Sequence, residues 1–377
     1  MTQREPAITI VSRAVMVRPV ITVVLLPLVV CGAAAIADFQ PTPPVAWNAC
    51  LTQLAAWYGS GDAVRIADNV LLYQRRTGGW PKNIDMARVL APVDVATIRD
   101  ERELNDSTID NGSTHTQLRY LARVFEATRQ TRFRDSFGVG LAYLFEAQYP
   151  NGGWPQYYPL RTNYSRYITF NDDAMIGVMR LLREIGESRV PFGFVDEATS
   201  ARARGAVQRG IGLIVKSQIR VGGKLTGWCA QHDERTLEPR DARTYEHASI
   251  SGRESVEIVR FLMSIERPAA DVVAAVEGAA TYLRSNQIRG LRLVTKPDPA
   301  LPHGRDIVAV ADPSAPPLWA RFYQIGTNRP IYSGRDGVIK FNLSEIEVER
   351  RAGYSWLGPY ASDLLDREYP AWKARLR

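Results

Sequence analysis

The sequence Gly-Gly-Trp-Pro occupies residues 78–81 and recurs at residues 152–155, and Thr-Gly-Trp-Cys at residues 226–229 is a weaker third copy. The tryptophans of successive copies are 74 residues apart both times. A stretch with apolar residues at three- and four-residue spacing precedes each copy, which is the pattern of an amphipathic helix. Because 74 residues suffice for two helices and their loops, the period predicts repeated helix pairs.

Further helical patterns lie between and after the three copies, and strand-like alternation is scarce. These patterns cover residues 116–128, 174–185, 255–265 and 268–283. Three helix pairs in a chain of this length close on themselves more readily than they extend as a solenoid. We therefore predict one all-α domain over residues 38–377, an (α/α)3 toroid of helix hairpins with an irregular C-terminal segment beyond residue 300. The tryptophan turns are expected to line a cleft at one end.

Composition supports a globular protein with an acidic partner. The 377 residues are 45% hydrophobic and 23% charged, which excludes a disordered chain. Lys and Arg number 47 against 40 Asp and Glu, a net charge of +7. This surplus excludes a dedicated polybasic arm but favours a polyanionic sugar, a nucleic acid or a membrane surface as partner. Three cysteines, Cys31, Cys50 and Cys229, are too few for a disulfide framework or a Cys-rich zinc cluster.

The N-terminus has the parts of a secretory signal. Arginines precede an uncharged apolar run at residues 20–36, and Ala-Ile-Ala at residues 35–37 offers a cleavage site. This pattern predicts a signal peptide over residues 1–37 and a secreted or periplasmic protein. An uncleaved anchor is the alternative, because a run of about 17 residues is borderline for spanning a bilayer. Export would place Cys50 and Cys229 in an oxidising compartment, where they could pair if they are neighbours.

Oxygen-bearing side chains gather just before two of the predicted helices. Residues 110–112 read Asp-Asn-Gly and residues 171–173 read Asn-Asp-Asp. Helix capping alone accounts for such residues. Adjacent carboxylates repel each other unless they share a cation, however, and an oxygen cluster without His or Cys suits Ca²⁺ rather than zinc. The four histidines have no metal-ligand spacing, and no catalytic triad, phosphate loop or dinucleotide fingerprint is present.

Three further stretches contain arginines that could take part in binding or catalysis. Residues 239–246 hold two arginines, two acids and a tyrosine, which on their own describe a solvated loop with local ion pairs. Arg321 stands among aromatic residues at 319–323, and Arg335 lies in a glycine turn at 333–337. Both settings suit bidentate binding of a carboxylate.

Taken together, these stretches resemble polysaccharide lyase family 10, the pectate lyases with an (α/α)3 toroid. The matching residues are 78–83, 109–112, 152–156, 169–175, 242–246, 319–323, 333–337 and 353–356. The family commonly reads Thr-Thr-Thr-Gln after Asp-Asn-Gly, whereas this chain has Thr-His-Thr-Gln with His115. A substrate subsite near His115 is therefore expected to differ.

The resemblance implies Ca²⁺-assisted β-elimination of polygalacturonate, in which the C5 proton is abstracted and the C4 oxygen leaves to give an unsaturated product. It implies Arg243 as the Brønsted base and Asp110, Asp172 and Asp173 as Ca²⁺ ligands. It also implies substrate contacts, with Arg321 and Arg335 as carboxylate clamps and Lys82 and Asn111 in lesser roles. We further expect a monomer with no nucleic-acid partner and no membrane association after signal cleavage.

The chemistry of elimination asks for these residue types. Enolate-like negative charge develops on the uronate carboxylate, and a divalent cation with arginines stabilises it. Arginine is an unusual base, because its pKa lies above about 12. Neighbouring cations would favour neutral Arg243, whereas Glu246 would oppose it. Alternatively, Arg243 acts electrostatically and the Tyr245 hydroxyl relays the proton.

Two other functions remain open on the sequence. An inverting glycoside hydrolase on the same architecture would use Asp110 with Asp172 or Asp173, as two carboxylates about 6.5–9.5 Å apart. A non-catalytic pectin-binding protein would use a surface of Trp and Arg. Ultraviolet absorbance separates these functions, because only a lyase creates a double bond in its product.

Overall fold

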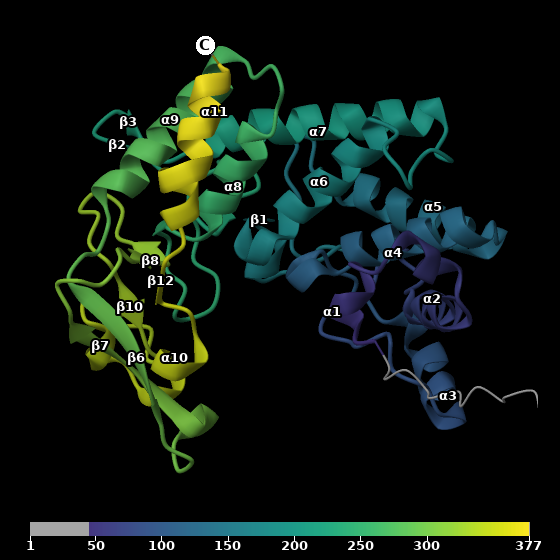
Figure 1. Ribbon diagram of the computed structural model, residues 1–377, viewed down its shortest axis with the longest axis horizontal. Coiled ribbons are helices and arrows are strands. Elements are labelled where there is room, and N and C mark those ends of the chain that lie inside the picture. Colours follow the sequence, from purple (N-terminus) through teal and green to yellow (C-terminus); the bar gives the residue numbers. More distant parts are fainter. Residues whose placement is uncertain (1–44, 377) are drawn as a thin grey trace, which may run out of the picture. The chain divides into compact units, whose positions relative to one another are not determined.

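The computed structural model describes residues 45–376 (Figure 1). The predicted signal peptide, with Cys31 and the start of the predicted domain, lies outside the described residues. Residues Pro44–Arg377 form one compact unit. Within the described part, no helix combines the length and the apolar character that a membrane span needs.

Helices occupy most of the chain up to residue 285, and three pairs of consecutive helices pack together as the 74-residue period predicts: α4 with α5, α6 with α7, and α8 with α9. Two single-turn 3-10 helices, η3 (Asp110–Gly112) and η5 (Asn171–Asp173), precede α4 and α6. The α-helices are α1 Trp47–Cys50, α2 Gly61–Tyr73, α3 Pro92–Asp100, α4 His115–Thr128, α5 Thr131–Ala147, α6 Ala174–Gly186, α7 Glu197–Ser217, α8 Glu254–Met263, α9 Ala270–Ser285, α10 Val348–Gly353 and α11 Tyr369–Arg375.

The prediction of an all-α toroid is wrong, because twelve strands form six antiparallel two-stranded sheets within residues 45–376. Five sheets join two-residue strands, which are too short to show alternation in the sequence. They are β1 (Ile168–Thr169) with β4 (Gln231–His232), β2 (Arg220–Val221) with β3 (Lys224–Leu225), β5 (Ile250–Ser251) with β9 (Phe322–Tyr323), β8 (Trp319–Ala320) with β12 (Leu357–Gly358), and β10 (Tyr332–Ser333) with β11 (Ile339–Lys340).

The sixth sheet is a hairpin of β6 (Leu291–Pro297) and β7 (Arg305–Ala311), whose full length is paired. It forms in the region predicted to be irregular. Three prolines interrupt the sequence there, but Pro297 is the last residue of β6 and Pro299 and Pro302 lie in the connection between the strands, so none removes an amide donor from the strand interior. Figure 1 shows the hairpin beside α10, and η6 (Pro302–Gly304) at its tip packs on that helix.

The three tryptophans of the repeat are core residues and do not line a cleft, contrary to expectation. Trp80, Trp154 and Trp228 are fully buried. Each indole Nε1 donates a hydrogen bond to a carbonyl oxygen of the helix before it, namely Val70 O, Leu144 O and Ile214 O at 2.7, 2.8 and 2.7 Å. Each tryptophan therefore fixes its turn against the end of its own helix.

A glutamine just after each of these helices connects the turn to the next helix. Gln74 Nε2 donates to Gly78 O in its own turn, at 2.8 Å, and to Ser136 O in α5, at 3.0 Å. Gln148 binds the second turn and α7, and Gln218 binds the third turn and α9, in the same way. The repeat thus places α2, α5, α7 and α9 in succession.

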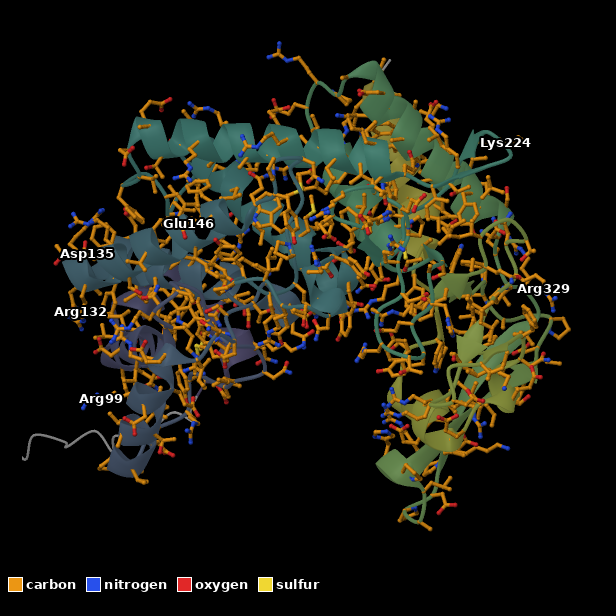
Figure 2. The ribbon with its side chains drawn as sticks, turned by 180° about the vertical axis from the view of Figure 1, so that it is seen from behind. Arg99, Arg132, Asp135, Glu146, Lys224 and Arg329 are labelled. Atoms are coloured by element: carbon orange, nitrogen blue, oxygen red, sulfur yellow. The ribbon has the colours of Figure 1, made fainter. Side chains whose placement is uncertain are left out.

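Glycine is required where a turn meets the next helix. Gly152 has φ +101°, and a Cβ there would lie 2.3 Å from Arg209 O of α7. Gly78 has φ +99°, with Val139 O of α5 at 2.7 Å. Arg132, Asp135 and Glu146, which Figure 2 labels, are exposed residues of the same helix α5. The repeat motif is therefore a packing device.

The repeat also positions three loops that carry acidic residues. The carbonyl oxygens of Trp80, Trp154 and Trp228 accept hydrogen bonds from the amides of Thr108, Thr169 and Ser251, at 3.1, 3.1 and 2.7 Å. Two or three residues after each of these amides comes an acid: Asp110 and Glu254, which are buried, and Asp172, which is half-buried. Each acid is thus held by main-chain bonds to a core tryptophan.

Candidate active site

The first group of polar residues surrounds Asp110, in η3. Its side chain is almost fully buried, and Oδ2 accepts hydrogen bonds from Gln156 Nε2, at 2.7 Å, and from Lys82 Nζ. Oδ1 is buried and has no hydrogen-bond partner among residues 45–376. Burial lowers the pKa of Lys82, but the bond to Asp110 outweighs it and raises the pKa above its usual value. Asn111 lies beside them with φ 50°, and its Nδ2 donates to Asn83 Oδ1 at 2.8 Å.

The second group surrounds Arg321, whose side chain is only 3% exposed. Three acceptors surround its Nη2: Glu254 Oε1 at 2.8 Å, Asn171 Oδ1 at 3.0 Å and Asp172 Oδ1 at 3.2 Å. Arg253 Nη1 lies 3.0 Å from the same oxygen of Asp172. Burial raises the pKa of Asp172, but the charges of Arg321 and Arg253 outweigh it, so this pKa is below its ordinary value. Asp172 is therefore held ionised between two guanidinium groups.

The third group surrounds Arg243. Its Nε donates to Glu246 Oε2 at 2.7 Å, and its Nη2 donates to Oε1 of the same carboxylate. Tyr354 Oη also donates to Glu246 Oε1, at 2.6 Å. The bond to Glu246 raises the pKa of Arg243 above its ordinary value. Because the Arg243 side chain is 43% exposed, the pair presents an oriented guanidinium to solvent.

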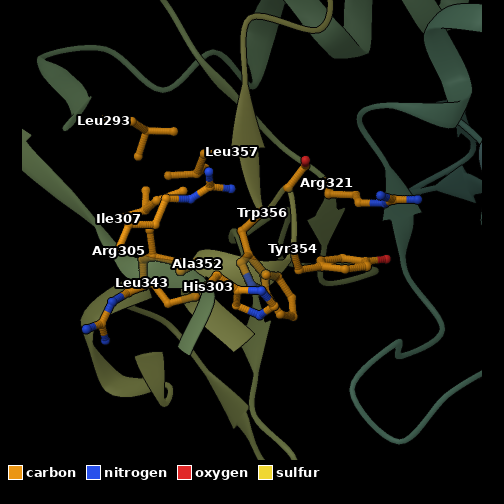
Figure 3. Close-up of a pocket in the computed structure, with 13 residues that line it drawn as sticks. Leu293, His303, Arg305, Ile307, Arg321, Leu343, Ala352, Tyr354, Trp356 and Leu357 are labelled. Carbon is orange, nitrogen blue, oxygen red and sulfur yellow. The ribbon is translucent and has the colours of Figure 1, made fainter. Parts of the chain in front are cut away.

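Tyr354 joins the second group to the third. Arg321 Cζ lies 4.7 Å from the centre of the Tyr354 ring, while the hydroxyl binds Glu246. In Figure 3 the Arg321 guanidinium and the Tyr354 hydroxyl point to the same side, away from Leu293 and Ile307. The cavity on the other side has a volume of about 400 Å³ and lies against the β6–β7 hairpin. The charged groups therefore face away from this cavity.

Tyr164 lies within electrostatic reach of the first and third groups. Burial raises the pKa of its hydroxyl, the charges of Arg243 and Lys82 lower it, and those of Glu246 and Asp110 raise it. The loops that carry Asp110 and Asp172, η3 and η5, are also in contact. The three groups consequently form one continuous site.

Asp172 and Asp173 both adopt the left-handed conformation, with φ 47° and 61°. This backbone costs on the order of 1–2 kcal/mol per residue and concentrates at functional sites. Asp173 has different neighbours from Asp172. Burial and the charge of Glu257 raise the pKa of Asp173 to about 6, against the opposing charge of Arg180. The structure thus places Asp173 toward α8.

Tyr245 is buried and surrounded by cations. The Cζ atoms of Arg350, Arg243 and Arg335 lie 4.8, 5.0 and 5.5 Å from the centre of its ring. Arg335 is 62% exposed and pairs with Glu349 at 2.9 Å. The predicted residues Arg243, Tyr245 and Arg335 are therefore brought together.

The family model of the pectic acid lyases matches residues 74–365. The chain belongs to this family. The lyase is also similar to the solved structure of a family 10 polysaccharide lyase from Cellvibrio cellulosa, with 32% identity, a TM-score of 0.70, and coverage of 86% of this chain and 94% of that one. An aspartate-to-alanine mutant of a family 10 polysaccharide lyase from Cellvibrio cellulosa, in complex with trigalacturonic acid, gives the same identity and TM-score over 86% and 95% of the two chains. A search of the curated proteins gives no match.

These similarities confirm the predicted family and enzyme class: the protein is a polysaccharide lyase. Three residues of its site were not predicted as functional, namely Glu254, Gln156 and Tyr354. Glu254 follows the third tryptophan turn as Asp110 and Asp172 follow the first two, so alignment of the repeats could have found it. Tyr354 lies in the matching stretch 353–356, but its contact with Glu246 could not be predicted, because that residue lies 108 residues earlier.

No ready-made metal cluster of three His, Cys, Asp or Glu residues occurs in the described part of the lyase. Even so, the Asp110 region fits a hard cation. Asp110 Oδ1 is a buried carboxylate oxygen without a partner, the neighbouring Asp172 and Asn111 offer only oxygen and amide groups, and Ca²⁺ prefers oxygen ligands. Cys50 and Cys229 are both buried free thiols and supply no ligand here.

Proposed function

We propose that this pectate lyase cleaves polygalacturonate by β-elimination with Ca²⁺ held at Asp110. The single observation that carries the proposal is the buried carboxylate oxygen Oδ1 of Asp110, which has no partner among residues 45–376 and lies beside the partly exposed Lys82. Asp172, on the adjoining loop, is the second ligand, and Asp173 is the third ligand that the family resemblance implies. When bound, the cation neutralises the uronate carboxylate and so makes the C5 proton more acidic.

Arg243 is proposed to take the C5 proton. Its bidentate pair with Glu246 fixes the direction of the guanidinium but also stabilises the protonated form. The guanidiniums of Arg335 and Arg350 contact the same Tyr245 ring as Arg243. Their positive charges repel protonated Arg243 and so favour its neutral form. If Arg243 instead acts only as an oriented cation, the neighbouring Tyr245 hydroxyl is the group that relays the proton.

Arg321 and Arg335 contribute to carboxylate binding in different ways. Arg321 is buried, its Nη2 is occupied by three acceptors, and its Nε is buried without a partner among residues 45–376. It therefore adds a fixed positive potential and one donor. Arg335 is exposed and can exchange Glu349 for a uronate carboxylate at little cost, because exposed ion pairs contribute about 0–1 kcal/mol.

Asp110 and Asp172 do not suit hydrolysis, although burial and Glu257 raise the pKa of Asp173 to about 6. An inverting hydrolase needs one carboxylic acid with a raised pKa. Lys82 binds Asp110 directly, and Arg321 and Arg253 hold the pKa of Asp172 below its ordinary value. Both carboxylates thus face cations, which suits ligands better than proton donors.

The decisive experiment is ultraviolet absorbance on polygalacturonate with Ca²⁺ and with EDTA. We expect absorbance from unsaturated products that EDTA abolishes and added Ca²⁺ restores. Reducing ends without absorbance would establish a hydrolase, and activity in EDTA would remove the cation from the proposal.

The remaining proposals concern the mature protein. We propose that residues 1–37 are removed on export, that residues 38–377 form a single catalytic domain, and that the secreted or periplasmic enzyme acts as a monomer. The mass of the exported protein and its size in solution test these points. A retained N-terminus or a dimer would contradict them.

A further inference from the structure

The loop at residues 156–167 carries an arginine that is oriented but has no charged partner. Arg161 Cζ lies 3.6 Å from the centre of the Tyr157 ring, and Arg161 Nη2 donates to Asn105 O at 3.1 Å. No carboxylate in the described part of the chain lies within ion-pair distance of it. The side chain is half-buried. Its guanidinium is therefore held in place while Nε and Nη1 remain available.

Arg161 is connected to the Asp110 group through the ring of Tyr157. Lys82 Nζ, which binds Asp110, lies 5.8 Å from the centre of the same Tyr157 ring. Gln156, the residue before Tyr157, donates to Asp110 directly, at 2.7 Å. The backbone of Tyr157 also forms a bridge with Thr108, two residues before Asp110. Arg161 thus lies beside the Asp110 group and shares the Tyr157 ring with Lys82.

The arginines of the site itself are all paired with carboxylates of the chain. Arg243 binds Glu246, Arg321 binds Glu254 and Asp172, and Arg335 binds Glu349. An ion pair neutralises much of the attraction that an arginine can offer to an anion. Arg161 is bound only by an aromatic ring and a carbonyl oxygen, so it keeps its full charge for a ligand.

We infer that Arg161 binds the carboxylate of a galacturonate unit beyond those at the reacting centre, forming a distal subsite of the polymer; this inference rests on the proposed function. Polygalacturonate carries a carboxylate on every unit, so a chain that leaves the Asp110 group presents another anion to the loop. A guanidinium offers two parallel donors to a carboxylate. Because stacking and the bond to Asn105 already restrict the side chain, binding costs little conformational entropy.

The test compares KM on long polygalacturonate with KM on a galacturonate trimer or tetramer for Arg161→Ala, with Arg161→Gln as a second variant. Loss of one charge-assisted hydrogen-bonded contact predicts a rise of about tenfold in KM on the polymer. For an oligomer too short to reach Arg161 from the reacting centre, KM should rise much less. Arg161→Lys should recover part of the loss.

Arg202 provides a matched control. It is an exposed arginine in α7 whose Cζ lies 4.3 Å from the Phe145 ring, and it too has no carboxylate partner among residues 45–376. Arg202→Ala removes an equal charge and an equal stacked contact, and it should leave KM on both substrates unchanged. A polymer KM that is also unchanged in Arg161→Ala would overturn the inference. Equal rises on both substrates with a lowered melting temperature would assign Arg161 a purely structural role.

Failure of the inference and failure of the proposed function give different results. If the wild-type protein forms no unsaturated product, the proposed function fails. Binding can then still be measured by electrophoresis through a gel that contains polygalacturonate and EDTA. Retardation of the wild type and of Arg202→Ala, but not of Arg161→Ala, would support the subsite without catalysis; equal retardation of all three would refute it.

Discussion

The helical repeats up to residue 285 supply three acids of the site together with Lys82, Arg243 and Arg253, whereas the segment that follows supplies further arginines and Tyr354. These acids are Asp110, Asp172 and Glu254, and each lies two or three residues after an amide that donates to a core tryptophan carbonyl. The later segment supplies Arg321 and Arg335 from short strands and turns. The difference shows how one site uses two kinds of scaffold. A repeated unit fixes several similar groups at once, whereas a segment without repeats places each group individually.

Individual groups of the site also differ in how firmly they are held. Asp110 and Glu254 are 3% and 2% exposed and are positioned by main-chain bonds. Arg335 is 62% exposed and rests against one acid of its own segment. Changes at Asp110 or Glu254 should therefore alter both stability and chemistry, whereas changes at Arg335 should alter substrate binding alone.

The largest expected effect is at Arg243, where the two regions meet through Tyr354. Arg243→Ala should lower kcat by about a thousandfold or more, because it removes both the proposed base and an oriented cation. Binding of polygalacturonate in the presence of Ca²⁺ should survive. Initial rates of ultraviolet absorbance measure the effect. Near-normal turnover would exclude Arg243 as the base, and a comparable loss in Tyr245→Phe alone would favour the relay.

Glu254 tests how strongly the repeats anchor the later segment. Glu254→Ala leaves the buried guanidinium of Arg321 with less negative charge, and breaking a buried ion pair costs about 3–5 kcal/mol. Urea unfolding should show a loss of this order. Glu349→Ala, which breaks the exposed pair with Arg335, is the matched control. Similar losses for the two variants would show that the two pairs do not differ as described.

The stability of the repeat region should fall in acid because of His232. Its Nε2 accepts a hydrogen bond from the Cys229 amide at 3.0 Å, so Nδ1 carries the proton and donates to Leu237 O at 2.8 Å. Burial lowers the pKa of His232 to about 4, from an ordinary 6.5. Below pH 6.5 the unfolded chain binds the additional proton first. The contribution is therefore complete above pH 6.5 and lost as the pH falls toward 4, by about 3 kcal/mol.

Urea unfolding at pH 7 and pH 5 measures this contribution. His232→Gln removes the titrating group, so its stability should change less between the two pH values than that of the wild type. The difference between the proteins isolates His232 from the carboxylates that also titrate. An identical pH dependence would contradict the assignment.

A smaller effect is expected for the metal requirement. Asp110→Asn removes one charge from the proposed ligand set, and the Ca²⁺ concentration that gives half-maximal activity should rise about ten- to a hundredfold. Asp68→Asn, at an exposed ion pair with Arg132, controls for the loss of one negative charge. Titration of activity from EDTA-treated enzyme provides the measurement, and an unaltered Ca²⁺ requirement would remove Asp110 as a ligand.

The sequence predicted what is local and periodic. Helix pairs followed from the 74-residue spacing, whereas the roles of Asp110, Asp172 and Arg243 are implied by the family resemblance and stay predictions. Two-residue strands such as Ile250–Ser251 could not be predicted, since their pairing depends on partners about 70 residues away. The buried tryptophans were misplaced for a related reason: a Gly-Gly-Trp-Pro turn looks the same whether its indole meets solvent or a helix end. Contacts such as Tyr354 with Glu246 exist only once the chain has folded.

The three glutamines that follow α2, α5 and α7 should make the unfolding of neighbouring repeats cooperative. Each one uses both amide hydrogens, one within its own repeat and one on the neighbouring helix, and a glutamate at that place could not do the same. Unfolding of one repeat therefore leaves a backbone carbonyl oxygen of the adjoining repeat without its hydrogen-bond donor. Proteolysis of the native enzyme should thus release no single helix pair as a stable fragment.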